Sequence, residues 1–180
     1  MQRNSEADRL ALLRLARTPG LGPAEIGKLL ARHQGPARAL DVLLELGQAA
    51  PRLARLADVE REWRAIEALG ARYLFRGEPD YPRLLAAVDH SPWVLAVLGD
   101  AAALHGRLVA MVGARNASAG GRKLARDIAR DLAEAGHGVV SGLARGIDGA
   151  AHEGALQGGR TVAVIATGLD VVYPAEHAGL

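Results

Sequence analysis

The segment "GVVSGLARGIDGAAHEGALQGGRTVAVIATG", residues 138–168, decides the fold. It opens with a short apolar run at 138–140 and closes with another at 161–168. Continuous apolar runs of this length are typical of strands that are buried on both faces. Between them the pattern predicts a helix from about Ile147 to Gln157. A strand, a helix and a second strand in this order predict a parallel pair with a right-handed crossover.

The same pattern continues upstream. Three more apolar runs precede the segment, at 72–75, 93–99 and 108–113. An amphipathic helix is expected over 119–135, with Leu124, Ile128 and Leu132 facing inward. The fold class is therefore α/β, with a parallel Rossmann-like sheet whose ligands bind at the carboxyl ends of the strands.

The first part of the chain differs, because over 5–68 the apolar residues recur at helical spacing between Gly and Pro breaks. Ser5 can cap a first helix, and the stretch TPGLGP ends it and starts a second helix at Pro23. A third helix is expected over 37–46, and Pro51 is expected to open a fourth. The residues expected to face inward are Leu10, Leu13, Ala16, Ile26, Leu29, Leu30, Trp63, Ile66 and Leu69.

We therefore expect two domains, a small all-helical domain over 1–69 and a Rossmann-like domain over 70–180. The chain stops at Leu180, where a doubly wound sheet normally continues for several more elements. We accordingly expect the second domain to be truncated at its C-terminal end.

Composition excludes several classes of protein. The 180 residues contain no Cys, which rules out disulfides, a thiolate nucleophile and Cys-based metal sites. The charged start and the absence of an apolar run of about 18 residues predict a soluble, cytoplasmic protein. Net charge is only +2, but every basic residue except Lys28 and Lys123 is Arg, which grips phosphates with a planar fork. The Arg preference of a GC-rich genome explains this equally well.

Ser141, Asp148 and His152 resemble a catalytic triad at first sight, but the spacing argues against one. Ser141 lacks the G-x-S-x-G elbow of α/β hydrolases. Asp148 and His152 lie one helical turn apart and can share a hydrogen bond, but neither easily serves Ser141 as well. A metal site is disfavoured because Glu153 is the nearest third ligand and points to another face. We expect no catalytic residue, no metal and no cofactor.

Glycine turns at strand ends are better candidates, because they present backbone N–H groups and a helix N-terminus to an anion. They lie in VGARNAS, SGLARG and GGR, and they match neither a dinucleotide fingerprint nor a P-loop. Turns of this kind that converge on one edge of a sheet predict a phosphate site. The residues expected to bind DNA or phosphate are Gly113, Arg115, Ser118, Ser141, Gly142, Arg145, Gly146 and Arg160.

The helix over 119–135 carries Arg122, Arg126 and Arg130 at four-residue steps, which could form a rail for phosphates. Acidic residues at pairing distance, such as Asp127 after Lys123, favour a solvated surface of ion pairs instead.

Taken together, these stretches resemble the DNA-processing protein A family, also called DprA or Smf. The resemblance covers nearly the whole chain and rests on VGARNAS, SGLARGIDGAAHEGAL and GGRTVAVIATGLDVVYP, with EPDYPRLL and SPWVLAVLG upstream. The TPGLGP module resembles the family's N-terminal domain of the sterile-alpha-motif or helix-hairpin-helix type. The resemblance implies a Rossmann-like domain that binds single-stranded DNA and loads the RecA recombinase onto it in natural transformation, without catalysis.

Carried across by position, the resemblance assigns the DNA pocket to Gly113 and Arg115, to Ser141 and Gly142, and to Arg160 where relatives commonly have Lys. The chain departs from the family at two other positions, with Ala114 in place of a usual Ser and Ala119 in place of a frequent aromatic residue. A family segment R-N-R-I-I-A-G-L, and the part associated with dimerisation and RecA contact, lie outside these residues. The resemblance implies a homodimer for the full-length protein.

A rival hypothesis is an enzyme of the lysine-decarboxylase-like group, which has a related Rossmann-like fold and cleaves nucleoside monophosphates. Those proteins carry a P-G-G-x-G-T-x-x-E segment whose Glu is needed for chemistry, and nothing in this chain matches it. A sensor of small nucleotides is a third alternative.

Overall fold

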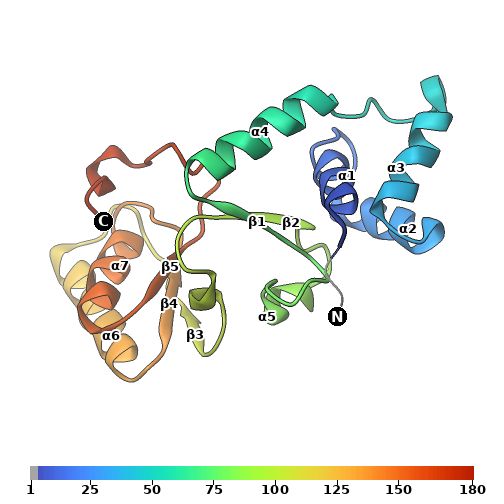
Figure 1. Cartoon of the computed structure of the whole chain (residues 1–180). Coiled ribbons are helices and arrows are strands. Elements are labelled where there is room, and N and C mark those ends of the chain that lie inside the picture. The colour runs from blue at the N-terminus through green and yellow to red at the C-terminus, as the bar shows by residue number, and fades with distance from the viewer. Residues whose placement is uncertain (1–3) are drawn as a thin grey trace. The chain divides into compact units, whose positions relative to one another are not determined.

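The computed structural model describes residues 4–180 (Figure 1). The chain divides into two compact units, a first that ends at Gly99 and a second over Asp100–Leu180. The two strands that follow residue 70 thus belong to the first compact unit. The domain boundary at 69/70 stays a prediction.

The first unit is mainly helical. Its helices are α1 (Glu6–Ala16), α2 (Pro23–His33), α3 (Pro36–Glu45), α4 (Leu56–Ala68) and the short α5 (Arg83–Ala86), with a 3-10 turn η1 (Gly47–Ala49). The predicted start signals of α1 and α2 are confirmed, because Ser5 accepts a hydrogen bond from the backbone N–H of Asp8 and Pro23 is the first residue of α2.

The predicted start of α4 at Pro51 is wrong, because the residues after it are held to α1 and to the turn that follows α1. The backbone N–H of Ala54 donates to Thr18 Oγ1, and Arg14 Nε donates to the carbonyl of Ala54. This pairing keeps the segment out of a helix until Leu56.

Leu12, Leu13 and Leu15 of α1 are buried at the centre of this unit. Strands β1 (Arg72–Phe75) and β2 (Val94–Val97) pair antiparallel beside them. Other predicted inward residues pack there as expected, namely Leu10, Ala16, Ile26, Leu29, Leu30, Trp63 and Ile66. Leu69 is exposed, contrary to prediction, because it caps the C-terminal end of α4.

The second unit contains the predicted parallel sheet. Its strands are β3 (Leu108–Ala110), β4 (Gly138–Ser141) and β5 (Thr161–Ala163), in the order β3-β4-β5 and all parallel. Its helices are α6 (Ala119–Glu134) and α7 (Ile147–Gly158), and short 3-10 turns lie at Ala101–Leu104 (η2) and Ala175–His177 (η3). Figure 1 shows α6 and α7 side by side against the sheet, so the α/β expectation is confirmed.

The buried face of α6 differs from the prediction. Its buried residues are Ala125, Ala129 and Ala133. Leu124 and Ile128 are exposed, and Leu132 is only partly buried. The reason is the close approach of α7, since any side-chain carbon at Gly154 would overlap the carbonyl of Arg126. Only small residues fit between helices at this spacing, so the larger apolar stripe faces solvent.

The prediction that the strands are buried on both faces is confirmed only for the central strand, β4. Most of β4 is buried, whereas β3 and β5 are edge strands of this sheet and are partly exposed. Both edge strands also end before their apolar runs do, which leaves Val112 and Val164 at the surface. Within residues 4–180, none of the helices has the length and apolar character needed to cross a lipid bilayer.

Candidate nucleic-acid interface

The segments that follow β3, β4 and β5 meet at one edge of the second unit, because parallel strands end on the same side of a sheet. We call this the carboxyl edge and define it as residues 111–118, 142–146 and 164–168. It begins next to the N-termini of α6 and α7, where helix dipoles favour an anion.

Gly146 brings the first two of these segments into contact. Its φ is +82°, and a side chain there would overlap the carbonyl oxygens of Ala114 and Arg115. The backbone N–H of Ile147 donates to the Ala114 carbonyl at 3.2 Å. The structure thus brings Arg115 beside the turn that contains Gly142, Arg145 and Gly146.

Asp148 connects the same two segments through hydrogen bonds to their backbones. Its carboxylate is buried, with Oδ1 accepting from the N–H of Gly113 at 3.3 Å and Oδ2 from the N–H of Gly142 at 3.2 Å. The expectation that these two glycines present free N–H groups to phosphate is therefore wrong. Sequence reasoning missed this role of Asp148, although an acidic residue in the first turn after a glycine turn is a signal for such a clamp.

Ser141 is also occupied internally. Its side chain is buried, and Oγ donates to the carbonyl of Met111 at 2.7 Å. It therefore holds β4 to the end of β3 and does not face the open edge, so the expected contact of its hydroxyl with phosphate is not supported.

His152 belongs to the core. Thr161 Oγ1 donates to the carbonyl of Val139 at 2.9 Å, so it accepts a hydrogen bond from His152 Nδ1 at 2.7 Å. Burial lowers the pKa of His152 below its ordinary value, which keeps the ring neutral. The possible hydrogen bond between Asp148 and His152 does not form, because both oxygens of Asp148 accept from backbone N–H groups. In the described part of the chain, His152 Nε2 is buried without a hydrogen-bond partner. These contacts leave no relay to Ser141 and support the rejection of a triad.

The open part of the carboxyl edge is the turn from 114 to 117. Within the described residues, the backbone N–H groups of this turn have no acceptor, and the exposed Arg115 makes no ion pair. Ser118, which was expected to bind phosphate, caps α6, with Oγ accepting from the N–H of Gly121 at 3.0 Å. The turn can therefore donate several hydrogen bonds to one anion.

Arg145 adds a second cation to this edge. Its guanidinium pairs with Glu176 at 3.0 Å, and both side chains are more than half exposed. Exposed pairs of this kind stabilise a protein by only about 0–1 kcal/mol, so a phosphate can displace the carboxylate at little cost.

Arg160 lies elsewhere, and the expectation that it converges with the other residues is wrong. It precedes β5, and its Nη2 donates to the carbonyl of His105 at 3.2 Å, before β3 begins. Its side chain also lies against Gly138, the first residue of β4. These neighbours belong to the amino ends of the strands, at the opposite end of the sheet from Arg115.

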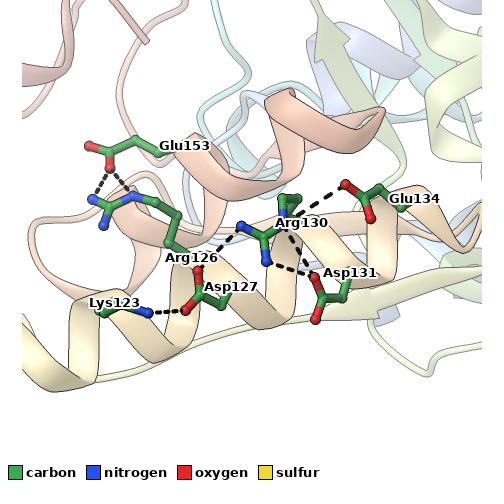
Figure 2. A network of polar contacts seen from close by, with 7 residues as sticks. All are labelled: Lys123, Arg126, Asp127, Arg130, Asp131, Glu134 and Glu153. Atoms are coloured by element: carbon green, nitrogen blue, oxygen red, sulfur yellow. Dashed lines mark hydrogen bonds and ion pairs between the residues drawn. The ribbon is translucent and has the colours of Figure 1, made fainter.

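Three basic residues of α6, Lys123, Arg126 and Arg130, take part in the network of ion pairs shown in Figure 2. The fourth, Arg122, lies outside this network and donates to the carbonyl of Ala117 at 3.3 Å. Lys123 pairs with Asp127 at 2.7 Å, and Arg126 pairs with Glu153 of α7. Arg130 contacts three acidic residues, Asp127, Asp131 and Glu134. Hydrogen bonding to Lys123 lowers the pKa of Asp127, which keeps this carboxylate charged. The interpretation as a solvated surface of ion pairs is confirmed for Lys123, Arg126 and Arg130.

Clusters of three or more His, Asp or Glu side chains that could hold a metal ion are not found in the described part of the chain. The carboxylate of Asp148 and the ring of His152 are each bound to other groups of the protein.

Family comparisons agree with this architecture. Residues 72–180 match the family described as DNA recombination-mediator protein A, and residues 6–65 match a DprA-like N-terminal HHH domain. The second match supports the helix-hairpin-helix expectation for the helical part, whereas the sterile-alpha-motif alternative stays a prediction.

Individual relatives give the same result. A DprA relative from Mycobacterium tuberculosis strain H37Rv is 40% identical over 172 residues, covering 84% of this chain and 44% of the relative. Protein Smf of Escherichia coli K12 is 45% identical over 100 residues, covering 55% of this chain and 26% of that protein. The X-ray structure of DprA from Streptococcus pneumoniae matches with a TM-score of 0.75 and 29% identity, covering 98% of this chain and 63% of that chain. The chain thus spans less than half the length of either sequence relative.

Proposed function

Since this chain belongs to the DNA recombination-mediator protein A family, we propose that it binds single-stranded DNA at its carboxyl edge and passes the strand to the RecA recombinase. The description of the family as a recombination mediator supports the second half of this proposal. The geometry of the carboxyl edge supports the first half.

The observation that carries the proposal is the turn from 114 to 117. Its unpartnered N–H groups, the free guanidinium of Arg115 and the N-terminus of α6 all favour a phosphate. These donors recognise the backbone of a nucleic acid and read no base, so binding should be indifferent to sequence.

The rest of the edge holds this turn in place. Asp148 clamps the loops through Gly113 and Gly142, and Gly146 allows the loops to touch. A preformed turn avoids the entropic cost of ordering a loop when the DNA binds. Arg145 can leave Glu176 for a second phosphate, which extends the contact along the strand.

We propose that this activity needs no catalysis by the chain. The side chains that resemble a triad are each committed to structural hydrogen bonds: Ser141 to Met111, Asp148 to two backbone N–H groups and His152 to Thr161.

Fluorescence anisotropy with labelled single-stranded and double-stranded oligonucleotides, over a series of salt concentrations, tests the proposal. We expect tighter binding of the single strand, with a log–log salt slope of about −0.7 for each neutralised phosphate. Equal affinity for all base compositions is the second expected result. Absence of binding, or release of free base from AMP as the rival enzyme would produce, would overturn the proposal.

A further inference from the structure

Tyr173 is the one aromatic residue of the sequence from 100 to 180. Its side chain is 63% exposed, although the neighbouring Pro174 is fully buried. In the first unit, by contrast, Tyr73, Phe75 and Tyr81 are all buried. A solitary exposed aromatic ring in a unit without an aromatic core contributes little to folding, so it is available for a ligand.

The segment that carries Tyr173 is anchored to the carboxyl edge. His177 Nδ1 hydrogen-bonds to the carbonyl of Leu143 at 2.9 Å, and Glu176 pairs with Arg145 at 3.0 Å. Both partners belong to the turn after β4. Pro174, which lies between Tyr173 and these residues in the sequence, is buried, so the backbone of Tyr173 is attached to an anchored segment.

Leu143 adds an independent sign of constraint. Its φ is +57°, a left-handed conformation that is unfavourable for a Leu residue. Its carbonyl is the one that meets the ring of His177. Strained backbone of this type persists where surrounding contacts enforce it, and it concentrates at ligand sites.

Apolar side chains are exposed both in the segment that carries Tyr173 and at the carboxyl edge. Val171 and Val172 precede it and are about half exposed, and Val112 and Val164 are exposed at the ends of the edge strands. Phosphate-binding groups next to an exposed apolar surface match the two faces of an unpaired nucleotide, which are its charged backbone and its flat base.

We infer that Tyr173 stacks on a base of bound single-stranded DNA and thereby selects single strands over duplex. The inference rests on the proposed function, because the phosphate contacts of Arg115 and Arg145 must first bring the strand to this edge. Bases in a duplex are covered by their neighbours, so the Tyr173 ring finds a free face only on an unpaired strand. Every base has such a face, which preserves indifference to sequence.

A comparison of two proteins and two oligonucleotides tests this inference. The parent chain and Tyr173→Ala are titrated with a single-stranded oligonucleotide and with the same backbone lacking bases. We expect Tyr173→Ala to bind the normal oligonucleotide about tenfold more weakly. We expect the parent and the variant to bind the abasic strand equally, and the salt slope to be the same for both proteins because phosphate contacts remain.

Two further variants separate stacking from general apolar contact. Tyr173→Phe keeps the ring and should bind like the parent, whereas Tyr173→Leu keeps an apolar side chain without a flat face and should bind like Tyr173→Ala. Circular dichroism of each variant checks that the fold is intact.

The contrary outcomes are distinct. If Tyr173→Ala binds both oligonucleotides like the parent, the ring contacts no base. If it loses affinity equally for both, the side chain acts on the backbone or on folding. If the parent binds neither oligonucleotide, the proposed function fails and the stacking inference fails with it. An effect of Tyr173→Ala on RecA capture alone would assign the ring to a protein partner and overturn the stacking.

Discussion

The two units of this chain differ in the size of the side chains that form their cores. The first unit buries large side chains, such as Leu12, Leu13 and Phe75, around a single core. The second unit buries mainly Ala and brings its helices together at glycines such as Gly154. Side-chain volume therefore stabilises the first unit, and close approach of backbones stabilises the second.

This difference explains why the second unit carries large apolar residues on its surface. Its tight helix pair has no room for Leu124 or Ile128, which remain exposed. Val112 and Val164 of the carboxyl edge, and Tyr173 of the segment attached to it, are likewise exposed. The binding surface that we propose is thus a consequence of the way in which the unit packs.

The largest effect is expected for Leu12→Ala in the first unit. Leu12 is 1% exposed, so truncation should lower the free energy of unfolding by about 3 kcal/mol. Urea unfolding followed by Trp fluorescence measures this change, because both tryptophans, Trp63 and Trp93, lie in the first unit. Leu44→Ala, at a half-exposed position of α3, is the control and should change the free energy by less than about 0.5 kcal/mol. Equal effects of the two variants would contradict the packing described for this unit.

The stability of the second unit should be sensitive to the addition of a single methyl group at the contact between its helices. Gly154→Ala places a methyl group against the Arg126 carbonyl, where neither backbone can easily move, and should cost about 2 kcal/mol. Gly120→Ala is the matched control, because nothing lies within 4 Å of the added carbon and α6 should tolerate it. Urea unfolding followed by circular dichroism compares the two variants. A Gly154→Ala protein as stable as the control would show that α6 and α7 do not touch as closely as described.

A smaller effect concerns pH and the buried His152. Its pKa in the folded state lies below the ordinary value of 6.5, because burial disfavours the charged ring. As the pH falls through about 6.5, the unfolded chain takes up the proton first, so the free energy of unfolding decreases by up to about 1.4 kcal/mol per pH unit. Above this pH His152 should contribute no pH dependence.

Urea midpoints at several pH values between about 5 and 8 check this sign. A His152→Gln variant should show a flatter profile than the parent over the acidic part of the range. Identical profiles for the two proteins would contradict the assignment of this pH dependence to His152.

Much of the fold could be predicted from the periodicity of apolar residues and from the residue types that start and end helices and strands. The parallel order of β3, β4 and β5 followed from alternating apolar runs and helices, and the cap at Ser5 followed from residue type. The inward face of α6 could not be predicted this way. Its apolar stripe is displaced by Gly154, which belongs to a different helix, so the reason is a tertiary contact that no local pattern contains.

The site was predictable at the level of segments rather than atoms. Glycine turns at strand ends correctly indicated which loops meet, as Gly146 and Arg115 show. The occupation of the Gly113 and Gly142 N–H groups by Asp148 depends on the angle at which α7 enters, which the sequence does not display. The position of Arg160 was predicted wrongly because its glycine turn precedes a strand. Arg160 therefore lies at the amino end of β5, whereas the other glycine turns follow their strands.

The most direct test of the carboxyl-edge proposal compares Arg115→Ala with Arg160→Ala in the salt dependence of single-stranded DNA binding. Each variant removes one exposed Arg from the second unit, but at opposite ends of the sheet. We predict that Arg115→Ala weakens binding to all sequences alike and reduces the log–log slope by about 0.7, whereas Arg160→Ala binds like the parent. Parent-like binding by Arg115→Ala, or an equal loss in both variants, would contradict the account.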